Sequence, residues 1–124
     1  MNSFKLVWSV KSVCGPKRKK NEDSIYPVKS GKGSLPFKAG VFDGMGGHKK
    51  GEVASSIAAK VMNLDFENIE DYVVKANEEI LNYQKNNIDS EGMGTTMTAI
   101  EIDINGVLKI AHVGDSRCYV LSNR

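Results

Sequence analysis

An aspartate followed by a glycine-rich turn is the strongest chemical signal in this sequence. Asp43 follows the short apolar run 37–42 and precedes Gly44-Met45-Gly46-Gly47-His48. A carboxylate at the tip of a strand is held rigidly, and neighbouring glycines let the backbone turn tightly and approach whatever the acid binds. This combination suits a hard cation or a phosphate. The alternative is an ordinary turn between a strand and a helix, in which Asp43 only caps the helix.

Further acids stand beside other predicted strands. Glu22 and Asp23 precede one predicted strand, and Asp115 lies in a predicted hairpin turn. Each alone is an ordinary turn residue, but together at one end of a sheet they could bind a divalent metal. Mg²⁺ and Mn²⁺ prefer carboxylate, carbonyl and water oxygens. Such ions often keep several waters, and a metal-activated water is a nucleophile.

Hydrophobic periodicity predicts the elements that must position these acids. Alternating or β-branched runs predict strands, and apolar residues three and four positions apart predict amphipathic helices. The predicted strands cover residues 4–13, 24–28, 37–42, 95–104, 107–113 and 117–121, and the predicted helices cover residues 51–63 and 68–84. Residues 29–38 and 86–94 are predicted loops. Strands, then two helices, then more strands are typical of an α+β fold with antiparallel sheets.

Asn105-Gly106 is the strongest short hairpin signal in the chain and predicts that the two flanking strands pair.

The apolar residues of both predicted helices form stripes, and packing in a protein core explains these stripes without a cofactor. The stripe of the first helix comprises Val53, Ala54, Ile57, Ala58, Val61 and Met62, and that of the second comprises Ile69, Tyr72, Val73, Ala76, Ile80 and Tyr83.

Composition narrows the class of protein. The chain has 124 residues, 40% of them hydrophobic and 26% charged, which suits one modest globular domain. A net charge of +2 argues against nucleic acid as the main partner, and Lys17-Arg18-Lys19-Lys20 is typical of a solvated loop. No apolar run approaches the length of a membrane span, and residues 1–20 lack a signal-peptide pattern.

Two other kinds of site have weak support. The spacing of Cys14, Cys118, His48 and His112 matches no zinc ligand pattern. Two cysteines without a C-x-x-C spacing suit a reducing compartment, so we expect a cytoplasmic protein. The glycine-rich turn also lacks the spacing and the lysine of a nucleotide-binding P-loop.

Four segments, taken in order, resemble the metal-dependent serine/threonine protein phosphatases of type 2C. They are Arg18-Lys19-Lys20-Asn21-Glu22-Asp23-Ser24, Val41-Phe42-Asp43-Gly44-Met45-Gly46-Gly47-His48, Gly94-Thr95-Thr96-Met97-Thr98-Ala99 and Ala111-His112-Val113-Gly114-Asp115-Ser116-Arg117. Met45 after the Asp-Gly pair and His48 after the Gly-Gly pair resemble the bacterial branch of the family. The ordered set is far more specific than any one segment and spans nearly the whole chain.

The resemblance implies an antiparallel β-sandwich flanked by helices, with two Mn²⁺ or Mg²⁺ ions at one edge. It implies that Asp43 bridges the metals, that the Gly44 carbonyl is a ligand, and that Glu22 and Asp23 bind metals directly or through water. It also implies that Asp115 binds a weaker third metal.

The same resemblance implies the reaction and its partners. Arg18 would bind the substrate phosphate, because its planar fork suits that oxyanion. A metal-activated water would attack phosphorus in line, without a phosphoenzyme. The substrate would be a phosphoserine or phosphothreonine protein, with a Ser/Thr kinase as the opposing enzyme.

Two departures from the family pattern matter. Many members carry a histidine, assigned as general acid, where this chain has Met45, and we expect His48 to be structural rather than its replacement. Complete catalytic domains are also roughly twice as long, and their later half supplies two further aspartates. We therefore expect residues 1–124 to be the N-terminal half of such a domain, with an incomplete fold. The alternative is a truncated, non-catalytic module that binds a phosphoprotein or a partner chain. An unfinished sheet also makes self-association plausible.

Overall fold

The computed structural model describes residues 5–46 and 50–123, so the sequence expectations for His48 and Gly47 lie outside the described residues. The strands are β1 (Leu6–Trp8), β2 (Asp23–Tyr26), β3 (Gly31–Gly33), β4 (Phe37–Met45), β5 (Gly94–Thr95), β6 (Met97–Ile102) and β7 (Leu108–Val113). The helices are α1 (Gly51–Val61), α2 (Ile69–Asn86) and the short 3-10 helix η2 (Ile88–Ser90). Strands flank a central helical pair, as the α+β prediction requires.

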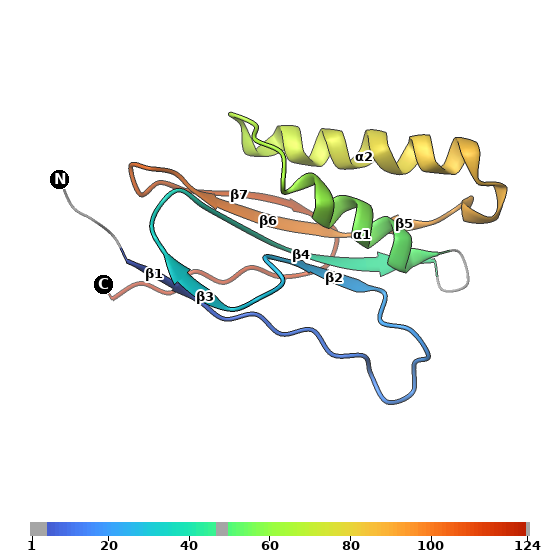
Figure 1. The fold of residues 1–124 in the computed structure, drawn as a ribbon, viewed down its shortest axis with the longest axis horizontal. Coiled ribbons are helices and arrows are strands. Elements are labelled where there is room, and N and C mark those ends of the chain that lie inside the picture. Colours follow the sequence, from blue (N-terminus) through green and yellow to red (C-terminus); the bar gives the residue numbers. More distant parts are fainter. Residues whose placement is uncertain (1–4, 47–49, 124) are drawn as a thin grey trace.

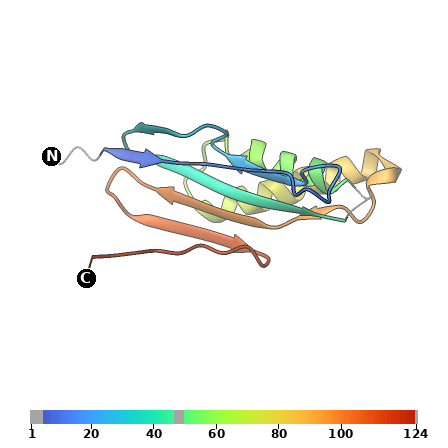
Figure 2. The same cartoon turned by 90° about the horizontal axis from the view of Figure 1, so that it is seen from below.

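One antiparallel sheet organises the fold. Its strand order is β2-β4-β6-β7, and β5 continues the pairing along the end of β4. The strands β1 and β3 form a separate two-stranded ribbon. Both long helices lie on one face of the main sheet, whereas the ribbon and the C-terminal segment lie on the other side (Figure 1). The turned view shows the C-terminal segment running beside β7 (Figure 2).

The helix-facing side of the sheet carries the core. Phe42, Met97 and Ala99 point towards the helices and are almost fully buried. They pack with residues of both predicted helical stripes, which are Ala58, Val61, Met62, Ile69, Tyr72 and Ala76. Val53 and Ile57 of the first predicted stripe are only partly buried, and they pack against a smaller cluster of Ala54, Ile80 and Met93. Core packing therefore confirms both helices and fixes α1 over the end of β4.

A partly buried lysine joins the sheet to the C-terminal end of α1. Lys38 lies on the helix-facing side of β4, and its Nζ donates to the carbonyl oxygens of Met62 at 2.7 Å and Leu64 at 2.6 Å. The hydroxyl of Tyr72 lies 3.1 Å from the same nitrogen. A cation among the last carbonyls of a helix is favourable because the helix C-terminus carries partial negative charge. This contact satisfies carbonyl groups that the helix itself leaves without partners.

Two predicted strands are wrong, one entirely and the other in its extent. The segment 117–121 is extended but forms no strand, and Leu121 is 97% exposed. The run predicted over 4–13 is a strand only from Leu6 to Trp8, where β3 pairs with it inside a predicted loop. A strand forms only where a second strand supplies hydrogen-bond partners for its backbone groups. An apolar pattern indicates that a segment is compatible with a strand, but it does not indicate that a partner strand is present. Among the described residues, no helix is long and apolar enough to cross a membrane.

Candidate metal and phosphate site

Two carboxylates face each other at one end of the sheet. Antiparallel pairing of β2 with β4 places Asp23 directly opposite Asp43, and residues paired in this way have β-carbons about 5 Å apart. Partial burial, followed by a hydrogen bond with Asp43 and the charge of that residue, raises the pKa of Asp23, while the Arg18 charge opposes this. Two like charges in this position favour either a shared proton or a cation close to both.

Glu22 adds a third carboxylate beside this pair. Its side chain is only 12% exposed, and Oε1 accepts a hydrogen bond from Nη1 of Arg18 at 3.2 Å. The other oxygen, Oε2, is buried and has no hydrogen-bond partner among the described residues. A buried carboxylate oxygen without a partner is costly unless a proton or cation satisfies it.

The side chain of Arg18 is 69% exposed, so most of the guanidinium faces solvent while Glu22 holds one of its N–H groups. A guanidinium has several N–H donors in a planar fork, which suits the oxygens of a phosphate. Arg18 therefore has donor groups to spare for a bound anion at the same end of the sheet.

Gly44 can only be glycine. A β-carbon at this position would collide with the backbone carbonyl groups of Gly51 and Glu22. The Gly44 N–H donates to the Glu22 carbonyl oxygen at 3.1 Å, which extends the pairing between the two chain segments past Asp23. The residue after Asp43 is thus fixed by close packing of three backbone segments rather than by an unusual backbone conformation.

Thr96 fixes the backbone of Asp43. The Asp43 N–H donates to Thr96 Oγ1 at 3.0 Å, and the Thr96 N–H donates back to the Asp43 carbonyl oxygen at 2.9 Å. The same hydroxyl lies 3.1 Å from Oγ of Ser116, which follows Asp115. Thr96 belongs to one of the recognised sequence segments, but the sequence alone does not assign it or Ser116 a role.

Asp115 is less closely associated with the other acids. Its side chain is exposed, and Ser116 rather than Asp115 lines the cleft of about 260 Å³ that contains Asp23 and Asp43. Across residues 5–46 and 50–123, the structure brings no three His, Cys, Asp or Glu side chains close enough together to hold a metal ion. Cys14 and Cys118 are both exposed free thiols.

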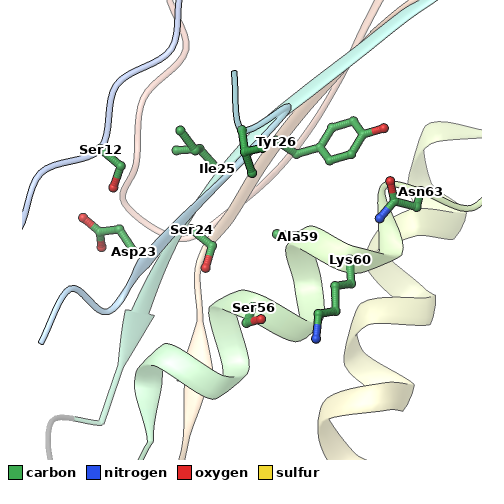
Figure 3. A pocket seen from close by; sticks show the side chains of 10 residues that line it. Ser12, Asp23, Ser24, Ile25, Tyr26, Ser56, Ala59, Lys60 and Asn63 are labelled. Atoms are coloured by element: carbon green, nitrogen blue, oxygen red, sulfur yellow. The ribbon is translucent and has the colours of Figure 1, made fainter. Parts of the chain in front are cut away.

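A larger groove adjoins the site on the helix side. It has a volume of about 370 Å³ and lies between β2, α1 and the N-terminal segment. Figure 3 shows Asp23 directed towards Ser12 at one end, while the side chain of Lys60 extends from α1 on the other side. Asp23 lines both this groove and the smaller cleft, so the two openings adjoin at that carboxylate.

The donor atoms fit a hard divalent cation in their chemistry. The facing carboxylates of Asp23 and Asp43 and the buried Oε2 of Glu22 are all oxygen donors, which Mg²⁺ and Mn²⁺ prefer. A cation here would remove the repulsion between the facing acids. The described residues supply only part of a closed coordination shell, because they form no cluster of three such ligands.

Comparison with known proteins gives one consistent result. The family model for protein phosphatase 2C matches residues 14–124. The serine/threonine phosphatase stp of Listeria monocytogenes serotype 4b is 41% identical over 96 residues, which cover 67% of this chain and 38% of that protein. The serine/threonine protein phosphatase PstP of Mycobacterium tuberculosis is 38% identical over 125 residues, covering 94% of this chain and 23% of that protein.

Solved structures agree with the sequence matches. The catalytic domain of PstP, crystallised in complex with two manganese ions, superposes with a TM-score of 0.67 at 31% identity and covers 93% of this chain. Stp1 from Staphylococcus aureus superposes with a TM-score of 0.64 at 27% identity. The chain spans about half the length of each of these two structures. The sequence and structural matches together place the chain in the protein phosphatase 2C family.

Proposed function

We propose that this chain supplies the N-terminal half of a catalytic domain that hydrolyses phosphoserine and phosphothreonine in proteins. The main observation in support of this proposal is that Asp23 and Asp43 face each other, with Glu22 and Arg18 beside them. Family membership and the two manganese ions in the PstP structure support a metal-dependent reaction. The opposing enzyme would be a Ser/Thr protein kinase, because only a phosphorylated protein is a substrate.

The proposed ligands are Asp43, Glu22, Asp23 and the Gly44 carbonyl, with Asp115 for a weaker third ion. Bound Mn²⁺ or Mg²⁺ would supply an activated water and positive charge near the phosphoryl group. The protein's own contribution is to hold oxygen donors still. Pairing of β2 with β4 sets the spacing of the two aspartates, and Thr96 holds the Asp43 backbone.

Arg18 is the proposed phosphate-binding residue. Glu22 holds one guanidinium N–H, which restricts the side chain and leaves the remaining donors free for phosphoryl oxygens. Because Glu22 contacts Arg18 through Oε1 and Oε2 has no hydrogen-bond partner among the described residues, one carboxylate can serve both the cationic side chain and a metal. This arrangement places phosphate binding and metal binding within one connected group of residues.

The test is Mn²⁺ binding and Mn²⁺-dependent hydrolysis of p-nitrophenyl phosphate by a complete catalytic domain that contains residues 1–124, compared with the Asp43→Asn variant of the same domain. We expect both to be lost or strongly reduced in the variant, since an amide is a poorer ligand than a carboxylate. Asp65→Asn is the matched control, because Asp65 is an exposed aspartate between α1 and α2 and does not line the cleft. Full activity and affinity in Asp43→Asn would contradict the proposal.

A second candidate function is phosphoprotein binding without turnover. The observation that favours it is the groove beside Asp23, combined with the absence of a three-ligand cluster in the described part of the chain. In that case the chain would bind a phosphoserine peptide, Lys60→Glu would weaken binding, and p-nitrophenyl phosphate hydrolysis would stay at the background rate with saturating Mn²⁺. Appreciable Mn²⁺-dependent turnover by the wild-type chain would eliminate this candidate.

A further inference from the structure

A fully buried serine of α1 contacts the segment that carries Glu22 and Asp23. The Ser55 hydroxyl donates to the Glu22 carbonyl oxygen at 2.6 Å. Its oxygen lies 2.9 Å from Oγ of Ser24, which can donate to it because the single Ser55 proton is already used. The alternative acceptor within the helix, the Glu52 carbonyl, is more distant at 3.3 Å. The Ser55 hydroxyl therefore joins α1 to the start of β2.

The Glu22 carbonyl receives a second hydrogen bond from the strand that carries Asp43. The Gly44 N–H donates to the same oxygen at 3.1 Å. One carbonyl thus collects donors from α1 and from the end of β4, and the two donors approach from different elements. This arrangement fixes the backbone of Glu22 relative to that of Gly44.

The first residue of α1 reinforces this contact. A β-carbon at Gly51 would meet Oε2 of Glu22 and the backbone of Met45. The helix therefore presses against the Glu22 side chain at Gly51 and holds the Glu22 backbone one turn later at Ser55. Both contacts act on Glu22, whose buried Oε2 has no hydrogen-bond partner within residues 5–46 and 50–123.

We propose that Ser55 is a positioning residue that holds Glu22 and Gly44 in the geometry needed for metal binding. This inference rests on the proposed function for its metal-binding consequence, whereas the positioning itself can be measured without metal. A hydroxyl in the outer shell of a metal site commonly contributes about tenfold or more to metal affinity when it orients a ligand. A buried serine with a purely structural role would change stability and leave metal affinity unchanged.

The experiment compares Ser55→Ala with Ser90→Ala. Ser90 is the matched control because it is also fully buried and its hydroxyl also donates to a backbone carbonyl, that of Asn87, in η2 away from the site. Two quantities are measured on the 124-residue chain. One is hydrogen exchange of the Gly44 amide relative to global stability, and the other is the Mn²⁺ dissociation constant from the electron paramagnetic resonance signal of free Mn²⁺.

We expect Ser55→Ala to lose Gly44 amide protection beyond its loss of global stability and to weaken Mn²⁺ binding by about tenfold or more. Ser90→Ala should change only global stability. Ser24→Ala, which keeps the bond from Ser55 to Glu22, should lie between wild type and Ser55→Ala. If Ser55→Ala does not fold, Ser55→Cys replaces it, since a thiol is a weak donor of similar size.

The outcomes separate the two proposals. Unchanged relative protection of the Gly44 amide would overturn the positioning role, and so would unchanged Mn²⁺ affinity in a Ser55 variant that has lost that protection. If wild type binds no Mn²⁺ while Ser55→Ala still loses Gly44 protection, Ser55 positions the segment as inferred and the metal-dependent function is what fails.

Discussion

Thr96 and the backbone of Asp43 exchange two hydrogen bonds, one through the Thr96 hydroxyl and one through the Thr96 N–H. The hydroxyl also contacts Ser116, so the loop that carries Asp115 is joined to the strand that carries Asp43 through one side chain. The position of the proposed metal-binding carboxylate therefore depends on a residue more than fifty positions away in the sequence.

Thr96→Val should weaken both folding and Mn²⁺ binding. The substitution keeps the shape but leaves the partly buried Asp43 N–H without its acceptor, which costs about 1–3 kcal/mol in the free energy of unfolding. Urea unfolding and Mn²⁺ titration measure the two effects. Thr98→Val is the control, because Thr98 is equally buried but its hydroxyl contacts the exposed His112 ring. Equal Mn²⁺ affinities in the two variants would argue against the role of Thr96.

Gly44→Ala should destabilise the chain severely. The added β-carbon would overlap the carbonyl groups of Gly51 and Glu22, and backbone atoms cannot move aside as a flexible side chain can. We expect a loss of at least about 2 kcal/mol in the free energy of unfolding, measured with urea. Gly15→Ala is the matched control, since nothing lies within 4 Å of a β-carbon there. Similar unfolding midpoints for the two variants would show that the site is not close-packed.

The stability of the β6–β7 hairpin should depend on pH through Asp103. Hydrogen bonds from the backbone N–H groups of Val107 and Asn105, together with Lys109, hold the pKa of Asp103 below its ordinary value of 3.8. The ionised form is therefore the favoured form in the folded state, and its contribution is present above pH 3.8 and is lost as the pH falls through the lowered pKa.

Wild type should accordingly be more stable than Asp103→Asn at neutral pH, and this difference should shrink as the pH falls below 3.8. Thermal unfolding over a pH series measures it. Asp65→Asn serves as the control, because Asp65 is an exposed aspartate outside the hairpin. A difference between wild type and Asp103→Asn that is constant from neutral to acid pH would contradict the assigned cause.

The sheet face opposite the helices should mediate self-association of the isolated chain. Val41 is 44% exposed and Ile110 is 43% exposed on that face. Exposed apolar side chains on a sheet face favour association with another chain. Sedimentation should detect dimers or larger species of wild type, and Ile110→Lys should shift the chain towards monomer.

Leu81→Lys provides the comparison for that experiment. Leu81 is similarly exposed, but it lies on α2 and so on the opposite side of the molecule. Its substitution should leave the association unchanged. A wild-type chain that sediments as a stable, compact monomer would refute self-association through this face.

Local sequence patterns predicted the fold class and both helices, and they singled out the acids that we propose as metal ligands. The apolar stripes predicted α1 and α2 because helical periodicity is a property of neighbouring residues, and core packing confirms them. Asn105-Gly106 predicted the β6–β7 hairpin for the same reason, since turn residues act locally, although residues 103–107 rather than two residues alone connect the paired strands. Glu22, Asp23 and Asp43 were identified because acids beside glycines and strand ends form a recognisable local pattern.

Only the tertiary structure decided how those residues meet. The pairing that places Asp23 opposite Asp43 depends on the register of two strands joined by a long connection, and register is set by packing rather than by either strand alone. Ser55 and Thr96 look like ordinary polar residues of a helix and a strand, and their hydrogen bonds to the acidic segments arise from long-range contact. The segment 117–121 has a strand pattern but pairs with no other strand in the described structure. The residue pattern of one segment indicates which secondary structure that segment can form. Strand pairing and the positions of side chains also depend on a second segment, and the whole fold determines where that second segment lies.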